Sequence, residues 1–292
     1  MSETGIVFIG AGRTGTVLCR MFAAAGLPVT GIASRNAESS SAAASLAGIP
    51  DFGNRLAEAA SRAGALFLTV PDAVIGGVGS RLRKAVKKGT IVMHCSGALS
   101  SDILAGFRGI GASVGSLHPL RSFASPDCDL PCGTETAFYF EGDSAAKSFA
   151  KQVTQALGAP FYEIQTQDKA LYHAAAVISS NFLVALEYYA LRCLEKAGIR
   201  RPQGLASLLP LIQSTVDNMS TAGVPGALTG PVERSDTETI RKHLEAMKRS
   251  GFPTDLYVCA AHQALQAAAE KHANHGVDAV EISAILNQFR GN

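Results

Sequence analysis

Three glycines near the start of the chain have a spacing that suits phosphate binding. A short apolar run, residues 6–9, leads directly into Gly10, Gly12 and Gly15, and a helical pattern follows. A glycine turn between a strand and a helix lets the backbone approach a pyrophosphate, whose charge the free N–H groups of the helix N-terminus stabilise. The sequence therefore predicts a dinucleotide site made by Gly10, Ala11, Gly12, Arg13, Thr14 and Gly15.

The end of the next predicted strand distinguishes the two nicotinamide dinucleotides. NAD sites usually place Asp or Glu there, to bind the ribose 2′-hydroxyl. This chain has Ser34, Arg35 and Asn36 at that point, and no acidic residue lies between Thr4 and Ala37. A guanidinium binds a phosphate through charge-assisted, often bidentate hydrogen bonds. We therefore expect NADP(H), although an ordinary exposed arginine at position 35 is the alternative.

Polar residues also follow other predicted strands. Ligands of open α/β sheets bind beyond the carboxyl ends of the strands. We expect the strand end at Val70, Pro71 and Asp72 to join the cofactor site. Ser96 and Gly97, at the next strand end, are expected to bind a substrate oxygen or the nicotinamide amide.

Two histidines lie at strand ends as well. His118 comes just after a predicted strand, and His94 comes two residues before Ser96. An imidazole can donate or accept a proton near neutral pH. His118 is therefore a candidate for proton transfer, and for either histidine the alternative is a hydrogen-bonded residue at the sheet edge.

A helical segment that begins near residue 166 carries the remaining candidates. Lys169 and His173 lie four residues apart on one helix face, among Ala, Val and Ile, and Asn181 follows. A buried lysine needs a cleft or a partner, and desolvation lowers its pKa toward the range useful for proton transfer. We predict Lys169, His118 and His173 as catalytic, with Lys169 or His118 as proton donor and Asn181 in substrate binding. An exposed Lys169 and a structural His173 are the alternative.

A loop at residues 226–236 carries one further candidate. Gly230 and Pro231 mark the loop, and Thr229 is a polar side chain that it could present to a substrate. An ordinary connection between helices is the alternative.

These residues need a sheet and helices to position them. In the first half, short apolar segments that read as strands alternate with amphipathic helical segments such as 13–25, 37–48 and 144–157. This alternation indicates an α/β, Rossmann-type, doubly wound and mostly parallel sheet. From about residue 166 the pattern is helical. We therefore predict an NADP-binding Rossmann domain over residues 1–165 and an all-α substrate and dimerisation domain over 166–292.

Composition excludes several classes of function. The 292-residue chain is 47% hydrophobic and 17% charged with a net charge of +2, which does not suit nucleic-acid binding. The apolar window at residues 170–191 contains polar residues, so we expect a buried helix and no membrane partner. Six scattered cysteines suggest a reducing cytoplasm. Cys128 and Cys132 alone do not complete a zinc site, so we expect no metal.

Six motifs together resemble those of one bacterial family. The motifs GAGRTG, VPD, HCSGALS, LHPLRSF, DKALYHAAAVISSN and LTGPVERSD occur in the order found in Rossmann-like proteins with a C-terminal helical domain of unknown function. That family is usually assigned to the NADP-dependent oxidoreductases. More distantly, the layout is similar to the 6-phosphogluconate dehydrogenase-like superfamily, which includes β-hydroxyacid and prephenate dehydrogenases and ketopantoate and pyrroline-5-carboxylate reductases. The resemblance implies a homodimer formed through the helical domain.

The resemblance also implies a reaction class. Hydride would pass between the nicotinamide and a small carbonyl, hydroxy, imine or amine compound in the cleft between the domains. Lys169 matches the lysine of the KxxxN motif of β-hydroxyacid dehydrogenases, but His173 replaces its asparagine. Ser96 resembles their strand-end serine, and His118-Pro119 is similar to the HP segment of prephenate dehydrogenases. Because no pattern is complete, the substrate stays open, and a non-catalytic NADP(H) sensor is the alternative function.

Overall fold

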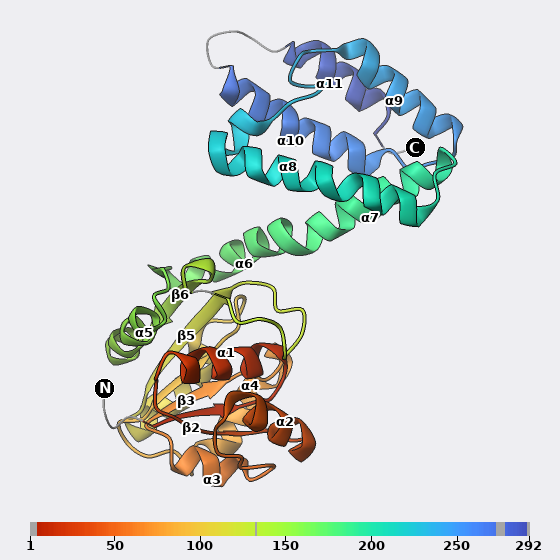
Figure 1. The fold of residues 1–292 in the computed structure, drawn as a ribbon. Helices are drawn as coiled ribbons and strands as arrows, with labels where there is room; N and C mark the ends of the chain where they lie inside the picture. Colours follow the sequence, from red (N-terminus) through yellow and green to blue (C-terminus); the bar gives the residue numbers. More distant parts are fainter. Residues whose placement is uncertain (1–4, 132, 273–277, 291–292) are drawn as a thin grey trace. The chain divides into compact units, whose positions relative to one another are not determined.

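The computed structural model describes residues 5–131, 133–272 and 278–290, and the chain divides into two compact units after Phe182 (Figure 1). The strands are β1 Ile6–Ile9, β2 Val29–Ala33, β3 Ala65–Leu68, β4 Ile91–His94, β5 Ser113–Leu120, β6 Ala137–Gly142 and β7 Phe161–Glu163. The helices of the first unit are α1 Arg13–Ala24, α2 Ala37–Ala47, α3 Leu56–Ser61, α4 Asp72–Leu82, α5 Ser144–Leu157 and α6 Lys169–Val177. The 3₁₀ segments η1 Ser101–Ile110, η2 Gly133–Glu135 and η3 Thr166–Asp168 join them, and the π-turn η4 Ile178–Phe182 ends the unit.

The strands form one sheet in the order β2-β1-β3-β4-β5-β6-β7. Neighbouring strands are parallel except β5 and β6, which pair antiparallel. The predicted Rossmann-type, mostly parallel fold is therefore confirmed for this unit. Sequence patterning did not predict α3, which is only six residues long.

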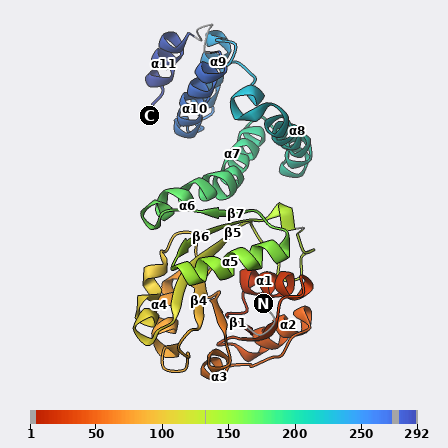
Figure 2. The same cartoon turned by 90° about the vertical axis from the view of Figure 1, so that its left-hand side faces the viewer.

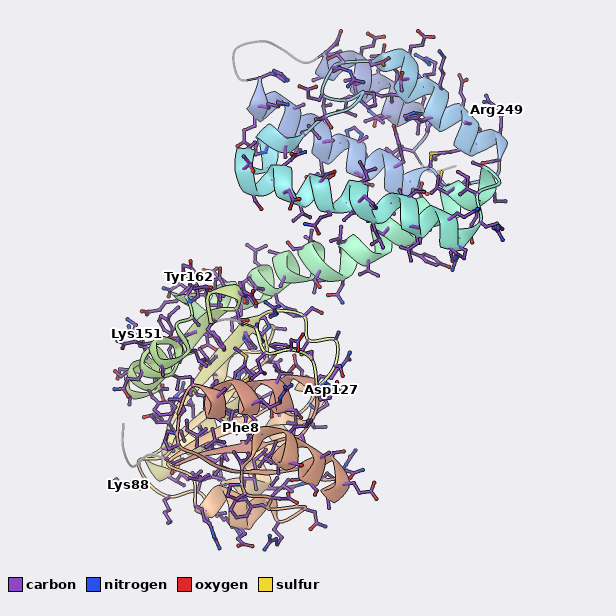
Figure 3. All side chains as sticks on the ribbon, in the orientation of Figure 1. Phe8, Lys88, Asp127, Lys151, Tyr162 and Arg249 are labelled. Carbon is purple, nitrogen blue, oxygen red and sulfur yellow. The ribbon has the colours of Figure 1, made fainter. Side chains whose placement is uncertain are left out.

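Two apolar layers enclose the sheet because its strands are apolar on both sides. One layer packs against α1, α2 and α5, and the other packs against α3, α4 and η1 (Figure 2). Phe8, labelled in Figure 3, anchors the first layer: its ring stacks on Phe67 at 5.2 Å and meets the edge of Phe22 at 5.4 Å. Exposed lysines such as Lys88 lie on the surface of this unit.

The register of the parallel strands brings their carboxyl ends together. Ile9 of β1 pairs with Leu68 of β3, Leu68 pairs with His94 of β4, and His94 pairs with Ser116 of β5. The loops that leave β1, β3, β4 and β5 therefore emerge along one edge, where the predicted site residues lie.

The second unit is helical. Its helices are α7 Leu183–Lys196, α8 Arg201–Ala227, α9 Thr237–Arg249, α10 Asp255–Lys271 and α11 Ala279–Gln288. A small core of Ile240, Leu244, Val258 and Ile282 joins α9, α10 and α11. Residues 166–182, which we assigned to the helical domain, belong instead to the compact unit that contains the sheet, because α6 is anchored to the strand ends by buried side chains.

One prediction about this region is wrong. We expected residues 170–191 to form a buried helix, but Leu171 is 77% exposed and Val184 is 70% exposed. The segment Thr166–Lys196 is long and apolar enough to cross a membrane by length and composition alone. Hydropathy measures how apolar the segment is, but it does not show whether other residues of the same chain bury that segment.

Candidate active site

The glycine loop is fixed by close backbone packing at two of its three glycines. Gly10 has a φ of +117°, and a Cβ there would lie 2.7 Å from the carbonyl oxygen of Thr69. A Cβ on Gly15 would lie 2.1 Å from the carbonyl oxygen of Gly10. The Thr69 hydroxyl donates a 2.7 Å hydrogen bond to that same oxygen. These two positions therefore require glycine for the fold itself.

Gly12 differs from its two neighbours. No described atom lies within 4 Å of the position that a Cβ would take on Gly12, and its φ of −80° is open to any residue. The fold gives no reason for glycine here. Space kept open at the N-terminus of α1 fits a pyrophosphate that approaches the backbone.

A cavity of about 290 Å³ opens beside this loop. Its lining combines the glycine loop with the ends of β3 and β4, namely Gly12, Arg13, Thr14, Leu68, Thr69, Val70, Pro71, Asp72, Cys95 and Ser96. The structure thus brings together half of the predicted cofactor residues with the predicted strand-end serine. The cavity suits the central part of a dinucleotide.

The residues at the end of β2 lie outside this cavity. Arg35 is exposed there, and the backbone N–H of Ser34 donates to the carbonyl oxygen of Gly53 at 2.9 Å. The Asn36 side chain caps α2, because its Oδ1 accepts a 3.1 Å hydrogen bond from the backbone of Ser39. The exposed Arg35 can therefore still take the predicted role of phosphate ligand. The side-chain oxygen of Asn36 already accepts a hydrogen bond within the protein.

Ser96 is held by several hydrogen bonds at the turn after β4. Its hydroxyl donates to the Asp72 carboxylate at 2.6 Å and accepts from the backbone N–H groups of Ala98 and Leu99 at 3.2 and 3.0 Å. Ser96 therefore ties this turn to the first residue of α4. Because the hydroxyl oxygen of Ser96 already accepts two backbone hydrogen bonds, we assign Ser96 to the wall of the cavity.

Lys169 is buried behind this turn. The side chain is only 3% exposed, and Nζ donates to the carbonyl oxygen of Ser96 at 2.9 Å and to the hydroxyl of Ser116. The Glu141 carboxylate lies 3.8 Å from Nζ and also accepts from Ser101. Burial lowers the pKa of Lys169 to about 8, against the opposing effect of Glu141. Lys169 thus joins β4, β5 and β6 to the start of α6.

His94 has a partner at each ring nitrogen. Its Nδ1 accepts from the backbone N–H of Ser96 at 3.1 Å, so Nε2 carries the proton and donates to the carbonyl oxygen of Ser100 at 3.2 Å. Burial, reinforced by Lys169, lowers the pKa of His94 to about 4. This geometry favours the structural alternative, because no ring nitrogen is left for a substrate.

His118 and His173 meet at Gly97. A Cβ on Gly97 would lie 2.5 Å from Nδ1 of His173 and 2.9 Å from Nε2 of His118. The two rings are perpendicular, with centroids 6.0 Å apart. Nδ1 of His173 is buried and has no hydrogen-bond partner among the described residues. Only a residue without a side chain allows both imidazoles to occupy this position.

Tyr172 completes the group, and sequence reasoning missed it. Its hydroxyl lies 2.7 Å from Nδ1 of His118. Burial, reinforced by Lys169 and His173, lowers the pKa of His118 to about 4, so this imidazole is neutral at pH 7. Burial raises the pKa of Tyr172. The available signal was its place beside His173 in the motif, but only the turn of α6 shows that Tyr172 also faces β5.

A second cavity, of about 460 Å³, opens in front of this group. We call it the imidazole cavity. Its lining comes from the end of β5, from β6, and from α6 with its π-turn: His118, Leu120, Arg121, Ser122, Tyr139, Tyr172, His173, Ala175, Ala176, Val177, Ser179, Ser180 and Asn181. Asn181 therefore lines the same cavity as His118 and His173, and its role in substrate binding stays a prediction. π-Turns within helices occur frequently at functional sites.

One predicted site residue and one cysteine considered for metal binding need separate mention. Thr229 belongs to the second compact unit, where it is exposed after α8, and its substrate role stays a prediction. Cys132 lies outside the described residues. Among the residues that the structure describes, no group of three or more His, Cys, Asp or Glu is arranged to bind a metal ion.

Comparisons with known proteins place the chain beside proteins of the same architecture. Residues 2–119 match the model of a Rossmann-like domain, and residues 136–266 match a domain of unknown function, DUF2520. A comparison with curated protein sequences found no match.

Solved structures resemble the chain over nearly its whole length. Protein TM1727 from Thermotoga maritima is 28% identical, with a TM-score of 0.70, and the match covers 91% of this chain and 99% of that one. Protein BF3122 from Bacteroides fragilis, assigned as an NADP oxidoreductase, is 22% identical with a TM-score of 0.73, over 90% and 98% of the two chains. A reductive aminase from Aspergillus terreus, solved with NADPH and ethyl-5-oxohexanoate, is 16% identical with a TM-score of 0.66, over 99% and 100%. Residues 2–119 of this chain thus form a Rossmann-like domain, and residues 136–266 belong to the DUF2520 domain.

Proposed function

We propose that the protein is an NADP(H)-dependent oxidoreductase that reduces a small carbonyl or imine compound, or oxidises the matching alcohol or amine. One observation carries the proposal. Ser96 lines the cavity beside the glycine loop, and the imidazoles of the second cavity pack against the next residue, Gly97. A cofactor cavity and a proton-transfer group are thus adjacent along one sheet edge. The architecture shared with an NADPH-bound reductive aminase supports the same reaction class.

The residues divide the work between binding and proton transfer. The backbone at Gly12 and the N-terminus of α1 hold the pyrophosphate, with Arg35 at the 2′-phosphate. When bound, NADPH supplies the hydride. The hydroxyl of Tyr172 and Nδ1 of His118 form a 2.7 Å hydrogen bond, and this pair delivers a proton to the substrate oxygen or nitrogen and regains one from solvent. Lys169 and Ser96 are positioning residues, because Lys169 holds the carbonyl oxygen of Ser96 from the buried side.

Isotope transfer tests the proposed reaction. NADPH that carries deuterium at C4, in each stereochemical form, is mixed with the protein and a panel of keto acids, ketones with amines, and cyclic imines. We expect at least one compound to yield a deuterated product, and only with one of the two stereoisomers of the deuterated NADPH. NADPH binding by calorimetry without turnover of any compound would instead support the sensor.

Replacement of Arg35 tests the choice of cofactor. Arg35→Ser removes the guanidinium but leaves the loop, because the side chain is exposed. We expect NADPH to bind at least about tenfold more weakly, near 1.4 kcal/mol, with NADH affinity unchanged. Titration of each cofactor measures this, and Arg81→Ser, at the exposed end of α4, is the control. Equal loss for both cofactors would contradict a 2′-phosphate contact.

We also propose that the protein is a homodimer formed through its helical unit. The support is a set of exposed apolar side chains on α7 and α8, namely Val184, Leu186, Tyr188, Leu205, Leu209 and Leu211. Monomeric soluble proteins rarely expose patches of this kind. A second copy would cover them, so we expect no membrane partner. The described cysteines are free thiols, which agrees with the cytoplasmic location that we propose.

Light scattering tests the dimer. The wild type should elute at twice the chain mass of 30.3 kDa. The double variant Val184→Asp/Leu211→Asp should be monomeric, because two carboxylates would otherwise be buried at the contact. Val280→Asp changes an 83% exposed residue on α11 and should leave the dimer intact. A monomeric wild type, or one that floats with lipid vesicles, would overturn the proposal.

A further inference from the structure

The imidazole cavity has an unusual balance of charge. Its only permanently charged side chain is the guanidinium of Arg121, and none of the described residues that line it is Asp or Glu. His118 and the hydroxyls of Tyr139 and Tyr172 add polar groups, none of which is a carboxylate. A ligand of this cavity therefore meets one positive charge and several hydrogen-bond donors.

Arg121 is held in place by one edge of its guanidinium. It follows β5 directly, and Nη1 donates to the carbonyl oxygen of Glu135 at 3.0 Å and to its Oε2 at 3.4 Å. The Nε and Nη2 atoms have no hydrogen bond within the described part of the chain. The ion pair with Glu135 is solvent-exposed, so it contributes little, roughly 0–1 kcal/mol, and does not compete strongly with a ligand. The edge made by Nε and Nη2 is the one that binds a planar carboxylate with two parallel hydrogen bonds.

The rest of the lining suits a small molecule with an apolar body. The rings of Tyr139 and Tyr172 lie 4.5 Å apart and form one wall, and Ala176 and Val177 of α6 line the cavity as well. Ser122 lies beside Arg121, and the π-turn contributes hydroxyl and amide groups. A single guanidinium balances a singly charged carboxylate, whereas a phosphate dianion would need further cations.

The two ends of the cavity are separated along β5. Arg121 lies three residues after His118, beyond a turn in which its backbone N–H donates to the carbonyl oxygen of Pro119 at 2.9 Å, and both side chains line the cavity. Because the arginine side chain is long, a small ligand can reach both. From this arrangement we propose that the substrate is a small carboxylic acid whose carboxylate binds Arg121 while its carbonyl or imine group faces His118. This inference rests on the proposed oxidoreductase function.

Matched pairs of compounds test the carboxylate. Each keto acid or cyclic imine acid is compared with its methyl ester, and with an analogue that carries a phosphate in place of the carboxylate. Wild-type protein should show a KM for the acid at least about tenfold below that for the ester. In Arg121→Gln the acid should lose this advantage, with the ester's KM and the Kd for NADPH unchanged. Arg201→Gln, an exposed arginine paired with Glu195 in the second unit, is the control.

Binding measured without turnover separates the two proposals. Ligand-detected NMR reports whether the acids bind in the presence of NADP⁺ and whether Arg121→Gln abolishes this. Arg121-dependent binding without turnover of any compound supports the carboxylate site and overturns the proposed reaction. Turnover in which acid and ester are equal, or in which Arg121→Gln affects both equally, overturns the carboxylate site alone. Preference for the phosphate analogue also overturns it.

Discussion

Gly97→Ala is expected to lower turnover about 100-fold while the protein stays folded and binds NADPH. The added methyl group would lie 2.5 Å from Nδ1 of His173 and 2.9 Å from Nε2 of His118, so both imidazoles must move. Displacement of an acid–base group by about 1 Å commonly costs about 10² in rate. Because the three atoms nearest to the methyl belong to the two imidazole rings, the chain can adjust by side-chain movement without unfolding.

Two measurements separate this effect from a loss of folding. NMR titration of the His118 ring should show its pKa rising from about 4 toward the ordinary histidine value, because displacement admits water. Gly77→Ala, whose added methyl meets open space, should change neither turnover nor this pKa. An unchanged pKa of His118, with normal turnover in Gly97→Ala, would show that the imidazoles do not act from this position.

Gly12→Ala should weaken NADPH binding at least about tenfold with a change of only a few degrees in Tm. The fold leaves the space beside Gly12 open and its φ of −80° suits alanine, so the methyl group itself meets no protein atom. A pyrophosphate drawn to the N-terminus of α1 would meet it. Calorimetric titration with NADPH and a thermal unfolding scan measure the two quantities.

Gly15→Ala provides the contrast. There the methyl would lie 2.1 Å from the carbonyl oxygen of Gly10, so this variant should lose stability before any cofactor is added. If Gly12→Ala binds NADPH as tightly as the wild type, the pyrophosphate does not approach this glycine. The proposed cofactor site would then be wrong even if the fold is Rossmann-like.

Local patterns were sufficient for the sheet and the glycine loop. β1 is four buried apolar residues followed by Gly10, and such runs with their glycine turns are encoded by neighbours in sequence. The pairing of β5 with β6 in the antiparallel sense was not predicted, because strand direction depends on the path of the connecting segment. The short helix α3 carries too few residues for its period to be recognised.

The sequence predicted most residues of the candidate site, but it predicted their roles only in part. Lys169 was expected at the reacting atoms because a lysine among apolar residues suggested a cleft. In the structure its Nζ contacts Glu141 and Ser96, which lie 28 and 73 residues away in sequence, and on this geometry we propose a positioning role for it. Tyr172 was not predicted. Which face of α6 meets β5 depends on tertiary packing, which the helical period does not specify.

The buried pair of Lys169 and Glu141 limits how this protein can diverge. Loss of either partner alone leaves an uncompensated charge in the interior, at a cost of about 3–5 kcal/mol, which is a large part of the stability of an ordinary domain. A change at position 169 is therefore tolerated only together with a change at 141, which lies in β6. We therefore expect the two positions to vary together among homologues. A homologue with a neutral residue at one of them should have an uncharged residue at the other.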